Sequence, residues 1–118
     1  MNKKKNFREP LFENGSFETE GFMEMLQSKD DSIVDTIEMT CCECPEQYNV
    51  FDKIGNQIAY IRVRYGELSV SCPSCLCNEI LTLEIDGFGG FANNEERISM
   101  FSLIIDEIDK YYKNLQNK

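Results

Sequence analysis

Six cysteines in two groups of three constrain the fold of this chain more than any other feature of its sequence. In the first group, Cys41 and Cys44 form a C-x2-C pair. In the second group, Cys72 and Cys75 form another such pair. Two residues between cysteines let a tight turn aim both sulfurs at one centre, and the spacer, residues 45–71, has room for the hairpins that would bring the two turns together. The spacing therefore predicts one metal site with four thiolate ligands.

The other two cysteines, Cys42 and Cys77, are possible alternative metal ligands, because each forms a C-x-C pair with a neighbour. The chain has no histidine, so a metal would be held by sulfur or carboxylate, and sulfur-rich ligation selects zinc over magnesium or calcium. Four sulfurs also complete the tetrahedron and leave no position for a catalytic water. Two other uses stay open: reduced core or surface thiols without metal, and disulfide or redox chemistry.

The segment Cys72-Pro-Ser-Cys75 resembles the knuckles of the zinc-ribbon group, in which two turns of the C-P-x-C type at the ends of β-hairpins hold a structural zinc ion. The CCEC sequence of the first group would be the second knuckle, so the resemblance covers residues 37–85. It implies a structural Zn2+ site, and the absence of tryptophan disfavours the one-iron site of rubredoxins. Segments 43–48 and 60–70 are also similar to small uncharacterised proteins of bacteria and their phages, which implies no activity.

Alternating apolar residues predict short antiparallel strands joined by turns. The clearest strand is Gln57–Arg64, where Ala59, Ile61 and Val63 point to one side. A short helix is expected between Phe17 and Ser28. Further strands are expected over residues 37–41, 48–51, 68–72 and 80–85.

A long amphipathic helix is predicted near the C-terminal end of the sequence. Asn93 followed by Glu96 matches a capping box. Apolar residues then recur at steps of three and four over about five turns: Ile98, Phe101, Ile105, Ile108, Tyr112 and Leu115. We expect an α+β fold, a small antiparallel β-sheet with zinc-ribbon-like knuckles and this helix packed on it. Residues 1–16 read as a flexible basic arm and residues 17–118 as a single α+β domain.

The chain is strongly acidic. Its 21 Asp and Glu residues against 12 Lys and Arg residues give a net charge of −9, and four of the cations fall within residues 1–8. Such a field repels nucleic acid and anionic lipid and favours a basic protein partner, although the charge could also serve solubility alone. The apolar runs are far shorter than the roughly 20 residues that cross a bilayer. We therefore expect no membrane partner and a cytoplasmic location.

One strand and one loop carry candidate binding residues. Tyr60, Arg62 and Arg64 interleave aromatic and cationic side chains on the outward side of a strand, a pattern typical of a nucleic-acid stacking platform. The glycine-rich loop adds Phe88 and Phe91 as possible binding anchors. In the structural alternative, each arginine pairs with a local acid and the phenylalanines lie beneath the helix.

The residue types also narrow the classes of function. Without histidine there is no Ser-His or Cys-His pair, and the carboxylates are expected on solvated faces, so we do not expect an enzyme. The sequence favours a small acidic zinc-binding protein that acts through protein–protein binding, as an inhibitor, immunity-type or regulatory protein that masks a basic target site. The alternatives are a zinc-ribbon adaptor that contacts nucleic acid through Arg62, Arg64 and the basic arm, or a thiol-redox protein.

Overall fold

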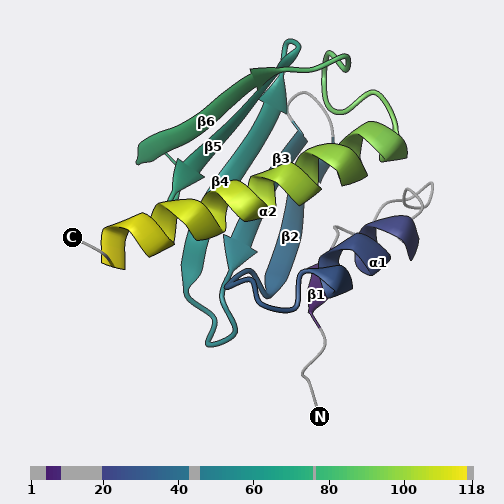
Figure 1. The fold of residues 1–118 in the computed structure, drawn as a ribbon. Helices are drawn as coiled ribbons and strands as arrows, with labels where there is room; N and C mark the ends of the chain where they lie inside the picture. The colour runs from purple at the N-terminus through teal and green to yellow at the C-terminus, as the bar shows by residue number, and fades with distance from the viewer. Residues whose placement is uncertain (1–4, 9–19, 43–45, 76, 117–118) are drawn as a thin grey trace.

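The computed structural model describes residues 5–8, 20–42, 46–75 and 77–116 of the 118-residue chain (Figure 1). Helices lie on one side of a curved sheet. In chain order the elements are β1 (Asn6–Arg8), α1 (Glu20–Ser28), β2 (Thr36–Cys42), β3 (Glu46–Phe51), β4 (Gln57–Arg64), β5 (Glu67–Cys72), β6 (Asn78–Glu84) and α2 (Asn94–Gln116).

The six strands of the described residues form one sheet, and their order across the sheet is their order along the chain. β1 runs parallel to β2, and each later pair of neighbours is antiparallel. The predicted α+β class, with a mostly antiparallel sheet and a C-terminal helix, is confirmed, whereas zinc-ribbon knuckles are not shown. From β2 onward, successive connections alternate between the two ends of the sheet, which decides where the cysteines lie.

The predicted alternation of apolar residues holds in β4. Ala59, Ile61 and Val63 face the core and are fully buried, because the pleat puts every second residue on the same face. The register pairs Ile61 with Tyr48 of β3 and with Val70 of β5. One buried row therefore crosses the middle of the sheet.

The turns that flank β4, at residues 52–56 and 65–66, lie in the intervals between the predicted strands. Gly55 of the β3–β4 turn has a φ of 93°, and Gly66 of the β4–β5 turn has a φ of 76°. Glycine adopts these left-handed conformations without the steric cost that a side chain brings. Tyr65 adopts a φ of 54° beside Gly66 and has no such freedom.

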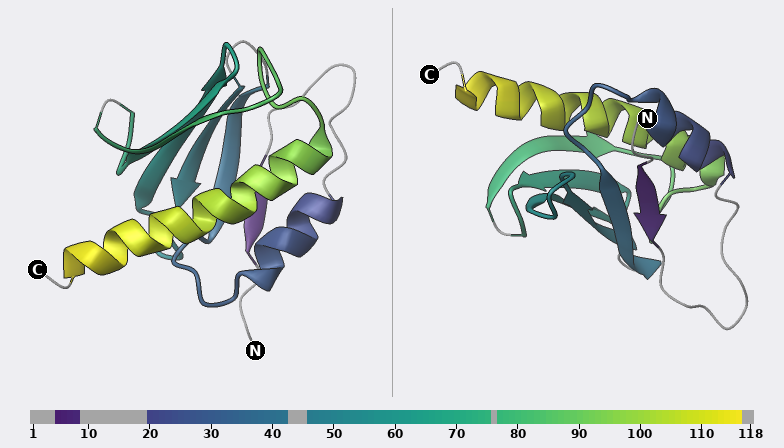
Figure 2. Two further views of the ribbon diagram at one scale, coloured as in Figure 1. Left: turned by 45° about the horizontal axis from the view of Figure 1, so that its top comes forward. Right: turned by 90° about the horizontal axis from the view of Figure 1, so that it is seen from below.

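Helix α2 begins directly after Asn93, as predicted. The Oδ1 atom of Asn93 accepts a hydrogen bond from the backbone N–H of Glu96 at 2.8 Å, which caps the first turn. Phe101, Ile105 and Ile108 of the predicted stripe are buried against the sheet. Figure 2 shows α2 lying across one face of the sheet, while the other face is covered by neither helix of the described residues. We call the second face the open face.

Helix α1 is confirmed from Glu20 to Ser28 of its predicted range, residues 17–19 lie outside the described residues, and the helix packs beside α2. Phe22 and Leu26 are its buried residues. The Phe22 ring contacts Phe101 of α2 edge-on, with ring centroids 5.0 Å apart, and contacts Phe7 of β1 at 4.8 Å. These rings join both helices and β1 to one core. Within the described chain, neither helix has the apolar length that a membrane crossing requires.

Residues 5–8 differ from the flexible arm that the sequence predicts for residues 1–16. They include β1, which pairs with β2 along three residues. A strand this short, in a basic and polar segment, has no hydrophobic period by which to recognise it. Residues 1–4 and 9–16 of the predicted arm lie outside the described residues.

A buried lysine precedes β1. The Lys5 Nζ donates hydrogen bonds to the backbone carbonyl of Ser32, at 3.2 Å, and to that of Val34. The Gln27 side chain of α1 exchanges two hydrogen bonds with the Lys5 backbone, at 3.1 and 2.8 Å. Lys5 therefore joins β1, α1 and the α1–β2 connection, rather than contributing to a solvated basic surface.

Candidate functional site

The structure places Cys41 and Cys72, one cysteine from each predicted pair, at opposite ends of the sheet. Cys41 pairs with Gln47 where β2 turns into β3, at the end of the sheet that also carries the β4–β5 turn (Figure 1). Cys72 pairs with Asn78 where β5 turns into β6, at the opposite end. The spacer between the pairs holds β3, β4 and β5, and an odd number of strands always delivers the chain to the other end of a meander.

Cys41 and Cys72 are consequently too far apart to bind one metal ion. Three strand spacings of about 4.8 Å and three residues of about 3.3 Å along the strands put their Cα atoms roughly 17 Å apart. Zinc–sulfur bonds of about 2.3 Å require ligand sulfurs that nearly touch. The predicted four-thiolate site therefore does not fit this fold. Cys44 and the side chain of Cys42 lie outside the described residues.

No group of three Cys, Asp or Glu side chains able to hold a metal ion occurs within the described residues. Any zinc site would therefore need a thiol from outside them or a rearrangement of the loops. Zinc binding by the cysteines stays a prediction, and the geometry gives it no assembled site from which to argue a mechanism.

The thiols of the second group differ in exposure. Burial raises the pKa of the Cys72 thiol to about 11, and a hydrogen bond with Tyr112 lowers it only in part. Cys75 and Cys77 are exposed, and the Cys77 Sγ lies 3.4 Å from the Ser74 hydroxyl. Thiol–disulfide exchange relies on a thiol of lowered pKa. Cys72 has the opposite property, so the structure gives the redox hypothesis no support at this position.

Tyr60, Arg62 and Arg64 lie in the polar rows of β4 on the open face. The register places Arg62 between Gln47 of β3 and Ser69 of β5. All three predicted surface residues are half-buried. Neither arginine forms an ion pair with an acid of the described residues. The expected pairing of these arginines with nearby acids is therefore not seen in this part of the chain.

The two phenylalanines of the glycine-rich loop have different environments. Phe91 is buried beside Phe101 of α2, so it belongs to the core and not to the predicted binding surface. Phe88 is 68% exposed and its ring lies 5.5 Å from that of Tyr65, which is 66% exposed. The Gly66 N–H donates to the Phe88 carbonyl at 3.1 Å and holds the pair together. The Arg64 guanidinium lies 5.1 Å from the Tyr65 ring centroid.

A buried cluster that the sequence analysis missed ties β3 to α2. The Arg97 guanidinium donates to both carboxylate oxygens of Glu46, from Nε at 2.9 Å and from Nη2 at 3.1 Å. The Tyr48 hydroxyl donates to Glu46 and accepts from Arg97 at 3.0 Å. Burial raises the pKa of Tyr48, and the charge of Glu46 raises it further. The Phe91 backbone N–H completes the cluster by donating to Glu46 at 3.1 Å.

The sequence held a partial signal for this cluster. Glu46 stands two residues before Tyr48 and four before Val50, so it belongs to the inward face of β3. Arg97 stands one turn before Phe101 on the apolar stripe of α2. Because the polar side chains of Glu46, Tyr48 and Arg97 are hydrogen-bonded to one another, we interpret the cluster as a structural link between β3 and α2.

Glu96 has a role other than that of a solvated carboxylate. It accepts hydrogen bonds from the backbone N–H groups of Asp86 at 2.7 Å, Gly87 at 3.2 Å and Ala92 at 2.7 Å. Partial burial acts to raise the pKa of Glu96, but these three donors together hold the pKa below its ordinary value. The carboxylate thus anchors the loop that presents Phe88.

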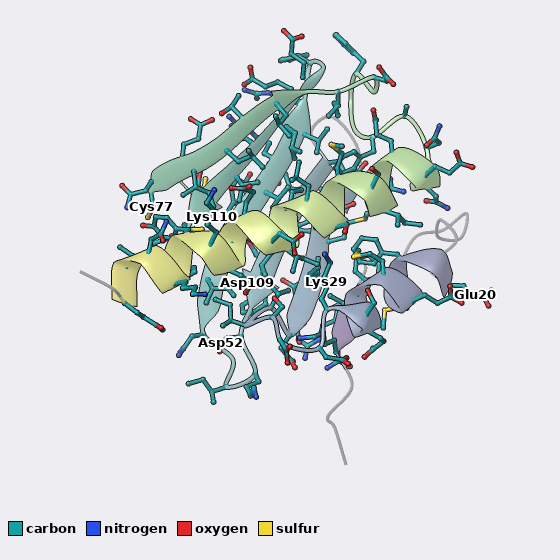
Figure 3. All side chains as sticks on the ribbon, viewed as in Figure 1. Glu20, Lys29, Asp52, Cys77, Asp109 and Lys110 are labelled. Carbon is teal, nitrogen blue, oxygen red and sulfur yellow. The ribbon has the colours of Figure 1, made fainter. Side chains whose placement is uncertain are left out.

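A hollow between the α1–β2 connection and α2 is lined by four acidic residues. We call it the acidic groove; its acidic lining residues are Asp30, Asp31, Asp106 and Asp109, and its basic ones are Lys29 and Lys113. Lys29 pairs with Asp106 at 2.9 Å, and the Asp109 carboxylate accepts from the Ile33 N–H at 3.0 Å. Figure 3 shows Lys29 and Asp109 along the side of α2 that faces this connection.

Comparison with protein-family models, with curated proteins and with solved structures found no match for this chain.

Proposed function

We propose that the protein acts by binding a basic protein partner and masking a positively charged site on it, as an inhibitor, immunity-type or regulatory protein does. The distribution of charge carries this proposal. The exposed acidic residues of the described chain are Glu20, Glu24, Asp30, Asp31, Glu67, Glu79, Glu84, Asp86, Glu95 and Asp106. The exposed basic residues are Arg8, Lys53, Lys110 and Lys113.

An excess of exposed carboxylates steers a basic partner toward the protein and repels other anions. The acidic groove concentrates part of this charge in a hollow rather than spreading it over a flat surface. One ion pair holds Asp106 and one hydrogen bond holds Asp109, so these two carboxylates need little reordering when a partner binds. Zinc is not part of the proposal, because the register places Cys41 and Cys72 at opposite ends of the sheet.

Affinity capture from native host lysate tests the proposal. The tagged protein is incubated at moderate salt, with and without nuclease, beside an unrelated acidic protein of matched net charge as a control bait. We expect a basic protein that survives nuclease treatment, leaves at higher salt, and is absent from the control. The purified partner should then lose its own activity when this protein is added. Capture of the same proteins by both baits would contradict the proposal.

A second candidate function is contact with single-stranded nucleic acid. The exposed ring pair of Tyr65 and Phe88, with Arg64 beside it, supports this candidate because bases stack on such rings while cations contact the backbone. Titration of a labelled oligonucleotide of about 12 residues, at two salt concentrations, separates the candidates. Salt-sensitive binding that is lost in Arg62→Ala/Arg64→Ala, but kept in Lys110→Ala/Lys113→Ala, would favour nucleic acid.

A further inference from the structure

An apolar pocket adjoins the acidic groove at the end of the sheet that carries the β3–β4 turn. We call it the Ile54 pocket; its apolar lining residues are Ile33, Ile54, Ile58, Pro73 and Tyr112. Its volume of about 460 Å³ falls within the range of ligand-binding pockets. Ile54 is 78% exposed at the tip of its turn, more than any other large hydrophobic side chain of the described residues.

The pocket and the groove form one continuous surface. Ile33, Tyr112 and Gln116 line both hollows. Asp30 and Asp31 are exposed and have no ion-pair partner among the described residues, whereas Asp106 is paired with Lys29. The charged lining residues of the two hollows are Asp30, Asp31, Asp52, Asp106 and Asp109 against Lys29, Lys53 and Lys113, so the apolar hollow opens onto a rim with a surplus of negative charge.

We infer that the Ile54 pocket and the acidic groove together form the docking site for a segment of the partner in which an aliphatic side chain stands beside lysine or arginine. The inference rests on the proposed function, because it locates the contact with a basic protein. The aliphatic side chain fills the Ile54 pocket. The stem of the basic side chain covers Ile33 and Tyr112, and its charged end reaches Asp30 or Asp31.

Charge decides between this occupant and a second copy of the chain. Two copies that met through this surface would bring Asp30 and Asp31 toward the same carboxylates of the neighbour, and like charges across an interface are unfavourable. A basic segment has the complementary charge, and it also covers the exposed apolar side chain of Ile54.

The walls of the docking site are held in place before any partner binds. The Tyr112 hydroxyl donates to the Ile58 carbonyl at 2.5 Å, which fixes the ring over the end of β4. The Asp52 carboxylate accepts from the N–H groups of Ile54 and Asn56, at 3.1 and 2.9 Å, and shapes the turn. Figure 3 shows Asp52 at this turn. A preformed site loses less conformational freedom on binding.

A titration followed by 15N–1H NMR tests the docking site without knowledge of the partner. The probe is a peptide of sequence GRLKG with blocked ends, and a GELDG peptide is the control. We expect the largest shifts at the amides of Ile33, Ile54 and Tyr112 with the basic peptide, and no comparable shifts with the acidic one. Shifts that centre on Tyr65 and Phe88, or that spread evenly over all exposed carboxylates, overturn the inference.

Matched variants separate a local site from a general charge effect. Asp30→Asn/Asp31→Asn should weaken peptide binding about five-fold, whereas Glu84→Gln/Asp86→Asn makes the same change in charge at the other end of the sheet and should leave it unchanged. Ile54→Ser tests the apolar part at an exposed position, where loss of folding is not expected. Equal weakening by both charge variants overturns the inference.

The same variants distinguish failure of the site from failure of the function. A basic partner that is captured equally by wild type and by Asp30→Asn/Asp31→Asn overturns the docking site and leaves the proposed function standing. If the basic peptide binds at the docking site but no basic protein is captured from the lysate, the proposed function is contradicted and the docking site is not. Sedimentation that shows dimers of the wild type, lost in Ile54→Ser, identifies a second copy as the occupant and overturns the inference.

Discussion

At the scale of single residues, Glu96 shows how one carboxylate can order a whole loop. Its three backbone hydrogen bonds gather the N–H groups of residues 86, 87 and 92 around one side chain. The sequence predicted a capping partner for Asn93, and the Asn93 half of that prediction is confirmed. The Glu96 side chain turns to the preceding loop instead, because that loop offers unpaired donors which only a folded chain brings within reach.

Replacement of Glu96 should alter how stability depends on pH. Because the pKa of Glu96 is lowered in the folded protein, its ionised form adds stability above the unfolded value of about 4.3, and this stability is lost as the pH falls through the folded pKa. We expect Glu96→Gln to lower the free energy of unfolding by about 1 kcal/mol at pH 7 and by less in acid. Thermal unfolding from pH 3 to 7 measures this, with Glu95→Gln as the control. A difference in stability between the wild type and Glu96→Gln that stays constant from pH 3 to 7 would contradict the prediction.

The thiols should react with alkylating agents at very different rates. With a pKa of about 11, only about one in a thousand Cys72 side chains is ionised at pH 8, and the thiol is also buried. We expect Cys75 and Cys77 to be labelled first and Cys72 only on unfolding, as followed by peptide mass spectrometry. Labelling of Cys72 as fast as Cys75 would revive the redox hypothesis.

At the scale of elements, the link between β3 and α2 depends on the buried Glu46 carboxylate and the Arg97 guanidinium, each of which needs the other to neutralise its charge. Glu46 and Arg97 are 51 residues apart in sequence, and no local pattern links them. The alternation in β4 and the stripe and cap of α2 were predictable because each is a property of neighbouring residues. The Glu46–Arg97 pair depends on where α2 crosses the sheet, and only the complete fold determines that.

Removal of one member of this pair should be far more damaging than loss of an exposed ion pair. Arg97→Met leaves Glu46 buried without its cation, which typically costs about 3–5 kcal/mol. Lys29→Met, which breaks the exposed pair with Asp106, should cost less than about 1 kcal/mol. Urea unfolding measures both values. The double variant Glu46→Gln/Arg97→Met should recover part of the loss, and a failure to recover any would show that packing dominates at this site.

At the scale of the whole molecule, two loops lie at the same end of the sheet only if an even number of antiparallel strands separates them along the chain. The strands at 48–51, 57–64 and 68–72 were themselves predicted, and they are all in the spacer between the two cysteine pairs. The spacing of the cysteines shows only that the chain between the pairs is long enough to return. An odd number of antiparallel strands delivers Cys72 to the far end from Cys41, so the length of the spacer could not decide the matter.

Cys41 and Cys72 are far apart, and this leads to a prediction that would fail if both residues bound one metal ion. In a double-mutant cycle, Cys41→Ser and Cys72→Ser should have additive effects on stability, within about 0.5 kcal/mol, because residues this far apart do not couple. Ligands of one structural zinc ion would instead be strongly coupled, since loss of either one abolishes the site. Zinc content of each purified variant, measured together with its free energy of unfolding, completes the test.

The strand order of the sheet, which follows the chain from β1 to β6, bears on how the molecule is made. Each hairpin from β2 onward pairs segments that emerge one after the other, so the sheet can assemble during synthesis, before α2 exists. Until residues 94–116 arrive, the face that holds Ile61 and Val70 lacks α2, the longer of its two helices. That interval is when a nascent chain of this kind most needs a chaperone, because exposed apolar sheet faces associate with one another.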